Sequence, residues 1–214
     1  MNRLPVIIRQ HLAAFRTLLV WTVVCGFIYP FVILGVTQVA FHKQANGSMV
    51  SYNGHVVGSS LLCQEFVDAK GNPLPQYFQP RPSAAIPTPA PKGDYGCDPT
   101  FSSATNLGPS NPTEVQLIKM RQQQISAFDH VPVSEIPADA VTASGSGLDP
   151  DISPANAAIQ VDRVAAARHL PVAEVQALVA KYTQGRTIGF LGEPRVDVLT
   201  LNIALDQLSA KSGG

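Results

Sequence analysis

The stretch LLVWTVVCGFIYPFVILGVTQVA, residues 18–40, decides the architecture of this chain. It lies in a segment without a charged side chain between Arg16 and Lys43, and it is longer than the ~20 apolar residues that cross the hydrocarbon core of a bilayer. Its apolar residues face all directions instead of forming one stripe, so the pattern predicts a transmembrane helix. The alternative is a buried core helix, but such helices are usually shorter and carry end caps that are absent here.

The charges ahead of the span predict its orientation. Arg3, Arg9 and Arg16 precede the span, and no Asp or Glu occurs before Glu65. Positive residues are retained in the cytoplasm, so we expect the N-terminus to be cytoplasmic and the bulk of the chain to lie beyond the membrane.

A cleaved signal peptide is the rival interpretation of the same stretch. Its apolar region should be ~7–15 residues long and end in small residues before the cut, whereas this span is longer and has Gln38 where a small residue is needed. We therefore expect an uncleaved anchor in the lipid bilayer. The expected divisions are a cytoplasmic tail over residues 1–17, the transmembrane helix over 18–40 and one periplasmic domain over 41–214.

The anchor contains residues that suit contact with another helix. Pro30 lacks an N–H and leaves the carbonyl of Gly26 without its helical donor, so a kink is expected. Gly26 and Gly35 allow close approach of a second backbone, and with Tyr29 and Pro30 they form a predicted partner-binding surface. The alternative is that Gly and Pro are simply common in membrane helices.

Composition limits the classes of function. Lys+Arg and Asp+Glu both total 15 in the 214 residues, so the net charge is zero and nothing indicates a nucleic-acid partner. Cys25 lies in the span, which leaves Cys63 and Cys97 beyond it. They can pair in an oxidising compartment, but spacing alone does not distinguish a disulfide from two free thiols.

The domain beyond the membrane reads as α+β with more helix than sheet. Asn53-Gly54 between two alternating segments predicts a two-residue hairpin turn. Capping and periodicity predict four helices and one strand: helices from Thr113 to Phe128, from Ser153 to about His169, from Pro171 to Tyr182 and from Asp197 to Leu208, and a strand over Ile188–Leu191.

Prolines dominate residues 73–112 and predict a long irregular loop. Within this loop Tyr77, Phe78 and Arg81 are aromatic and basic enough to form a docking surface or to pack against the domain. A disordered linker is the alternative, but adjacent aromatic residues are unusual in linkers.

Motifs for catalysis or metal binding are not found in the sequence. There is no phosphate-binding P-loop, no nucleophile elbow and no His or Cys spacing typical of zinc, so we expect neither a catalytic residue nor a metal site. The densest polar cluster covers residues 141–154. Its Asp149 and Asp151 suit a partner or a hard cation, or they simply complement the dipole of the helix that follows.

The order of several short motifs resembles the C subunit of the bacterial Kdp potassium-transporting ATPase. The matching pieces cover nearly the whole chain: residues 26–30, 44–48, 58–66, 77–78 with 81–83, 106–112, 141–154 and 202–206. The resemblance implies a non-catalytic, single-pass subunit of the bacterial inner membrane. Its implied partners are a channel-like potassium-translocating subunit, a P-type ATPase subunit and a small membrane peptide.

The resemblance also implies a catalytic chaperone that raises the ATP affinity of the ATPase subunit. ATP and potassium are then handled by the complex, and this chain binds no cofactor tightly. A direct nucleotide contact would fall on Ser144, Gly145, Ser146 and Gly147, although the predicted topology places them where ATP is scarce. The alternative function is a free-standing, membrane-anchored periplasmic binding protein or enzyme, which the absence of a nucleophile–base pair disfavours.

Overall fold

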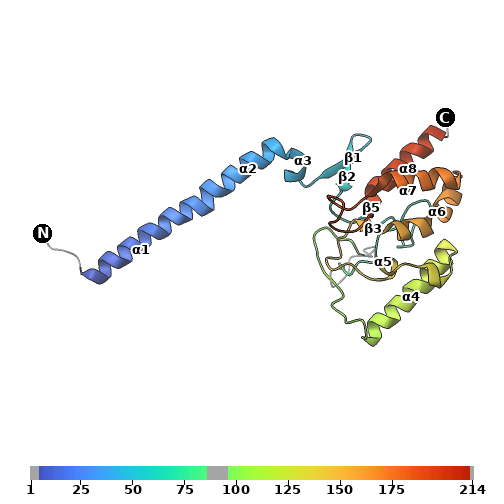
Figure 1. Ribbon diagram of the computed structural model, residues 1–214, viewed down its shortest axis with the longest axis horizontal. Helices are drawn as coiled ribbons and strands as arrows, with labels where there is room; N and C mark the ends of the chain where they lie inside the picture. Colours follow the sequence, from blue (N-terminus) through green and yellow to red (C-terminus); the bar gives the residue numbers. More distant parts are fainter. Residues whose placement is uncertain (1–4, 86–95, 213–214) are drawn as a thin grey trace. The chain divides into compact units, whose positions relative to one another are not determined.

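The computed structural model describes residues 5–85 and 96–212, and the chain divides into an N-terminal unit up to Ser48 and a domain from Met49 onward (Figure 1). Arg3, used above for orientation, and Pro87, Pro89 and Pro91 of the proline-rich loop lie outside the described residues.

The anchor is one long helical run with an irregular turn inside it. Helix α1 (Val6–Val23) passes through a π-helical turn, η1 (Val24–Ile28), into α2 (Tyr29–Ala40). Within the described part of the chain, this is the one helix long and apolar enough to cross a membrane. The helix begins at Val6, well before the predicted span, because no Gly or Pro interrupts the sequence between Pro5 and Gly26.

The disturbance expected at Pro30 takes the form of this π-helical turn. Tyr29 and Pro30 begin α2 directly after the turn, and the N–H of Tyr29 reaches back five residues to the carbonyl of Val24. Wider turns of this kind let a helix continue past a residue that cannot donate. A short helix, α3 (His42–Ala45), ends the unit.

The predicted hairpin is confirmed. Strands β1 (Met49–Tyr52) and β2 (His55–Ser59) pair antiparallel with Tyr52 opposite His55. Asn53 and Gly54 both have positive φ, 50° and 81°, as a two-residue turn of the primed type requires.

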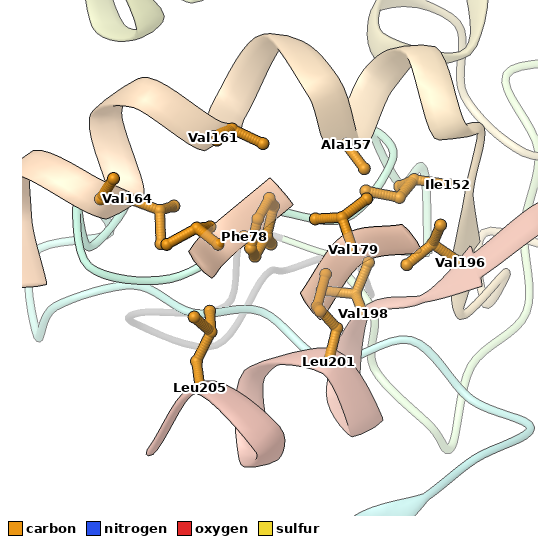
Figure 2. Packing of buried hydrophobic residues seen from close by; sticks show 12 residues of the cluster. Phe78, Ile152, Ala157, Val161, Val164, Val179, Val196, Val198, Leu201 and Leu205 are labelled. Atoms are coloured by element: carbon orange, nitrogen blue, oxygen red, sulfur yellow. The ribbon is translucent and has the colours of Figure 1, made fainter. Parts of the chain in front are cut away.

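The core of the domain lies between three C-terminal helices and a small sheet. Helices α6 (Pro154–Arg168), α7 (Val172–Tyr182) and α8 (Val198–Ser212) surround an antiparallel sheet in the order β3 (Asp151–Ile152), β5 (Arg195–Asp197), β4 (Thr183–Gln184). Their apolar faces meet around Phe78, which enters the cluster from the proline-rich loop (Figure 2). The predicted α+β class with a single N-terminal membrane helix is confirmed.

The predicted starts of the C-terminal helices agree with their capping contacts. The Ser153 hydroxyl accepts a hydrogen bond from the Asn156 N–H at 3.0 Å, and His169 ends α6 in the left-handed region. Asp197 accepts from the Thr200 N–H at 2.7 Å at the start of α8.

The helix expected from Thr113 differs from its prediction in its cap and its face. Helix α4 (Pro112–Asp129) is capped by Asn111, whose side chain accepts from the Thr113 N–H at 2.9 Å, so the predicted capping box at Thr113 is wrong. Pro at the first helical position favours this earlier start. The side expected to be a core stripe is only partly buried, and α4 contributes nothing to the main cluster. A 3₁₀ turn, η2 (Val133–Glu135), and the short α5 (Ala138–Val141) follow it.

The strand predicted over Ile188–Leu191 is also wrong. Thr187 and Leu191 form an isolated antiparallel bridge, and the three residues between them form a turn. Gly189, in the middle of the apolar run, has φ 82° and reverses the chain there.

Candidate functional site

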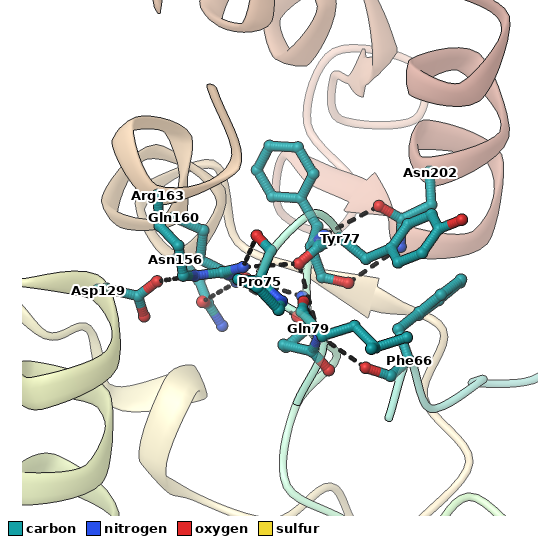
Figure 3. A network of polar contacts seen from close by, with 11 residues as sticks. Phe66, Pro75, Tyr77, Gln79, Asp129, Asn156, Gln160, Arg163 and Asn202 are labelled. Carbon is teal, nitrogen blue, oxygen red and sulfur yellow. Dashed lines mark hydrogen bonds and ion pairs between the residues drawn. The ribbon is translucent and has the colours of Figure 1, made fainter. Parts of the chain in front are cut away.

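The proline-rich loop enters the domain through residues 75–79, which begin in a turn and whose backbone is held by side chains. Asn202 accepts from the Phe78 N–H and donates to the Phe78 carbonyl, both at 2.9 Å. Gln160 accepts from the Gln79 N–H at 2.7 Å and donates to its carbonyl at 3.2 Å. The two buried amides, on α8 and α6, thus satisfy the backbone N–H and carbonyl groups of Phe78 and Gln79 (Figure 3).

Two arginines of α6 bind the preceding carbonyls of the same segment. Arg163 donates to the carbonyls of Pro75 and Tyr77 at 2.6 and 2.9 Å, and its other edge meets the Asp129 carboxylate at 2.6 Å (Figure 3). Burial raises the pKa of Asp129, and the charge of Arg163 opposes that rise. Arg168 donates to the Gln76 carbonyl at 2.6 Å. We call Gln160, Arg163, Arg168 and Asn202 the loop clamp.

The structure separates the predicted docking residues of this segment. Phe78 has no exposed surface and packs in the core. Its side chain therefore packs against the domain, which was the alternative to a docking role. Tyr77 lies under the Arg168 guanidinium at 4.7 Å, and its hydroxyl donates to Asp206 at 3.4 Å. Burial is the main cause of the raised pKa of Tyr77.

The run Ser144–Gly147 forms a packed loop and not an open cradle. The Gly147 N–H donates to the Ser144 hydroxyl at 2.8 Å, and the Gly147 carbonyl accepts from Ser83 at 2.7 Å. A Cβ at Gly147 would lie 2.5 Å from the Ser103 carbonyl, and its φ is +71°. Only Gly145 and Ser146 are exposed, so the groups that a phosphate would need are largely used within the chain, and nucleotide contact stays a prediction.

A disulfide fastens the neighbouring loops. Cys63 and Cys97 are bonded, with their Cα atoms 5.5 Å apart, which settles the alternative left open by their spacing. The Cys63 N–H also donates to the Leu148 carbonyl at 3.0 Å, and the Cys97 N–H to the Ser83 hydroxyl at 3.0 Å. The bridge joins the segments around Cys63 and Cys97, and these two hydrogen bonds connect them to Leu148 and Ser83.

The two carboxylates predicted to bind a partner or a cation are each paired with an arginine. Asp149 meets Arg81 at 2.8 Å, and Asp151 meets Arg195 at 3.1 Å. No cluster of metal-ligating side chains occurs among residues 5–85 and 96–212. Burial raises the pKa of Asp151, with Arg195 opposing it. Both carboxylates are thus held in ion pairs within the chain, and their binding of a partner stays a prediction. Arg81, which pairs with Asp149, also lines the cavity beside the clamp.

That cavity brings several polar side chains together beside the loop clamp. It has a volume of about 320 Å³ and lies between α4, the segment 79–83 and α6. Arg81 and Arg121 both line it, with the Gln79 and Gln124 amides. The Arg81 Nε is buried and has no hydrogen-bond partner among the described residues. Burial lowers the pKa of Arg121, which has its Nη1 bonded to the Val141 carbonyl at 2.8 Å.

This arrangement can receive a hydrogen-bond acceptor, such as a carbonyl or carboxylate. The cavity also contains Glu65 and Asp129, so its lining is not uniformly positive. It is a binding feature by geometry.

Sequence reasoning located Arg81 but missed the loop clamp and Arg121. One signal was present: Asn156, Gln160 and Arg163 recur at the spacing of one helical face that otherwise reads as core. The predicted anchor residues Gly26, Tyr29, Pro30 and Gly35 all lie exposed on the helical run of the N-terminal unit. A Cβ at either glycine would meet nothing within 4 Å.

Comparison with known proteins gives one consistent result. The family described as KdpC, K+-transporting ATPase, c chain, matches residues 11–207. Similar proteins called potassium-transporting ATPase KdpC subunit occur in Methylococcus capsulatus, 47% identical over 91% of this chain and 96% of the relative, and in Gemmatimonas aurantiaca, 49% identical over 95% and 96%. One from Paraburkholderia phytofirmans is 50% identical over 88% of this chain and 92% of the relative.

Proposed function

Because the chain belongs to the KdpC family, the c chains of K+-transporting ATPases, we propose that it is the non-catalytic accessory subunit of a high-affinity, ATP-driven potassium import complex. Its proposed partners are a channel-like potassium-translocating subunit, a P-type ATPase subunit and a small membrane peptide. The observation that carries the proposal is the match over residues 11–207, which includes both the anchor and the domain.

The proposed location is the bacterial inner membrane, with the N-terminus in the cytoplasm and the domain in the periplasm. Arg9 and Arg16 near the start of the helical run support this orientation by the positive-inside rule. The Cys63–Cys97 disulfide supports it independently, because such bonds persist in oxidising compartments and are rare in the cytosol.

The chain also acts, in this proposal, as a catalytic chaperone that raises the ATP affinity of the ATPase subunit. The domain is on the opposite side of the membrane from ATP, and Ser144 and Gly147 are engaged within the chain. We therefore favour coupling through the helix-packing surface of the anchor over direct nucleotide contact. Such coupling needs a two-state partner whose equilibrium the anchor biases.

The experiment is a comparison of the purified complex with and without this chain. The Michaelis constant for ATP should be lower with the chain present, while the maximal rate at saturating ATP changes less. A matched pair separates the two routes: Ser146→Ala removes the exposed hydroxyl of the loop, and Gly26→Leu fills the anchor surface. Coupling through the anchor predicts that only Gly26→Leu raises the constant. A Michaelis constant that does not depend on the chain contradicts the chaperone role.

A further inference from the structure

The cavity beside the loop clamp is lined by two arginines whose guanidinium groups are only partly used by the chain. Arg81 donates through Nη1 to Asp149 at 2.8 Å. Arg121 donates through Nη1 to the Val141 carbonyl, also at 2.8 Å. Among the described residues, neither arginine makes a hydrogen bond through Nε or Nη2. These two atoms form the edge that binds both oxygens of a carboxylate, so each arginine is held at one end and keeps a carboxylate-binding edge.

The Nε of Arg81 is the clearest sign that an acceptor belongs at this edge. It is buried, and no hydrogen-bond partner for it occurs within residues 5–85 and 96–212. Burial of an unpaired donor lowers stability, so such atoms are rare in folded proteins and need an explanation. A ligand oxygen in the cavity would pair with this Nε after a small rotation of the guanidinium.

The charges that line the cavity select a ligand that carries both signs. Asp129 and Arg81 are each neutralised by an ion pair within the chain. The remaining charged residues of the lining are Arg121 and Glu65, whose charges balance. A simple anion would therefore bring an unpaired negative charge into the site, which is costly. A carboxylate ligand needs a positive group of its own, and the Glu65 carboxylate, with about four acceptor positions, can receive it alongside contacts within the chain.

The size and walls of the cavity limit the rest of the ligand. Its volume of about 320 Å³ is at the lower end of the range for small-molecule sites. Val67, Pro80, Ile125 and Phe128 give it apolar walls. The interior of a peptide segment does not carry a carboxylate and an ammonium group on one carbon atom, whereas a free α-amino acid does. An apolar side chain on that carbon would match the walls.

We propose that this cavity binds a free α-amino acid with an apolar side chain of about the size of leucine. The ligand carboxylate lies on the Nε–Nη2 edges of Arg81 and Arg121, and its ammonium group lies on Glu65. The ligand side chain packs against the apolar walls. The inference goes beyond the proposed function and does not depend on it, because the site lies within this one chain.

Binding has a structural consequence for α4. This helix contributes nothing to the main core cluster, and Arg121 belongs to it while Arg81 belongs to the segment 79–83. A ligand held by both arginines therefore joins α4 to the rest of the domain. We expect the bound amino acid to slow hydrogen exchange of the α4 amides, since local opening of the helix must then release the ligand.

The test is calorimetric titration of the full chain in nanodiscs, without partner subunits. L-Leucine should bind saturably with a Kd on the order of 1 mM or tighter. Two analogues should bind at least about tenfold more weakly, because each lacks one charge-assisted contact: 4-methylpentanoate has no ammonium group, and L-leucinamide has no carboxylate. Equal affinity for either analogue overturns the proposal. So does the absence of saturable binding for all of L-valine, L-leucine and L-phenylalanine.

Variants separate the ligand contacts from the structural role of the same residues. Arg81→Gln and Arg121→Gln should each weaken leucine binding at least about tenfold. Asp149→Asn is the matched control, because it breaks the same ion pair but keeps the Arg81 guanidinium, and it should bind leucine and slow exchange of α4 as the wild type does. If Arg81→Gln and Asp149→Asn lose binding equally, the role of Arg81 is structural and the proposal fails.

The ammonium contact has its own readout. Glu65→Gln removes the negative charge from the lining, so it should weaken binding of L-leucine and strengthen binding of 4-methylpentanoate. Loss of folding alone would weaken both. Unchanged affinities for both compounds would contradict the placement of the ammonium group on Glu65 and overturn the choice of an amino acid as ligand.

Discussion

Replacing Asn202 with leucine tests the loop clamp, which fixes one wall of the cavity. Asn202 is 1% exposed, and its amide provides both hydrogen bonds of the Phe78 backbone. Leucine has a similar size but leaves one N–H and one carbonyl buried without partners. Each such group costs about 1–3 kcal/mol, and the added apolar burial returns about 1 kcal/mol. We therefore expect the free energy of unfolding to fall by about 1–5 kcal/mol.

The assay is urea unfolding of the full chain in detergent, followed by far-ultraviolet circular dichroism. Hydrogen exchange of residues 75–79 should accelerate at urea concentrations where the rest of the domain is still protected. The control is Gln123→Ala, which removes an exposed amide from α4 and should change the free energy by less than about 0.5 kcal/mol. If Asn202→Leu also stays within that limit, the clamp does not hold the loop as argued.

Three further predictions concern other parts of the chain. Burial raises the pKa of Asp197 above 3.8, so the folded state keeps this proton to a higher pH than the unfolded state, and stability is lost as pH rises through the folded pKa. Asp197→Asn keeps the cap to Thr200, so this variant should be more stable than the wild type at pH 7 and should lose that advantage as pH falls toward 3.8. Urea unfolding midpoints measured across pH test this. Reduction of the Cys63–Cys97 bridge, which has a sequence separation of 34, should lower the free energy of unfolding by about 3–4 kcal/mol. The measurement is urea unfolding with and without reductant in the Cys25→Ser background, and an unchanged midpoint would refute the prediction. Exchange of residues 18–40 for a plain Leu/Ala span of equal length keeps membrane insertion but removes the π-helical turn and the small-residue surface. Recovery of the complex and growth at limiting potassium should therefore fall. Wild-type values for both would show that the anchor serves only to attach the domain to the membrane.

Local signals explain most of what the sequence predicted correctly. Asn53-Gly54 gave the hairpin, and Ser153-Pro154 gave the start of α6, because each depends on backbone preferences of a few adjacent residues. Ile188–Leu191 failed because a short apolar run is compatible with a strand, a helix or an exposed turn, and periodicity does not separate them.

The site depended on contacts that local reasoning does not reach. Phe78 and Asn202 are 124 residues apart, and Gln79 and Gln160 are 81 apart, so the clamp appears only when the whole topology is assembled. The same holds for Arg81 and Asp149, which sequence analysis chose separately as partner-binding residues and the structure brings together as an ion pair. A polar residue on the buried face of a helix can be recognised from the sequence, but the residue that it contacts cannot be identified from spacing.

The most direct test of the central claim is affinity purification of the tagged full chain from native membranes in mild detergent, with every co-purifying protein identified by mass spectrometry. The account predicts recovery of a potassium-translocating subunit and an ATPase subunit in fixed ratio with this chain, together with potassium-stimulated ATP hydrolysis. Recovery of this chain alone, without associated ATPase activity, would contradict it.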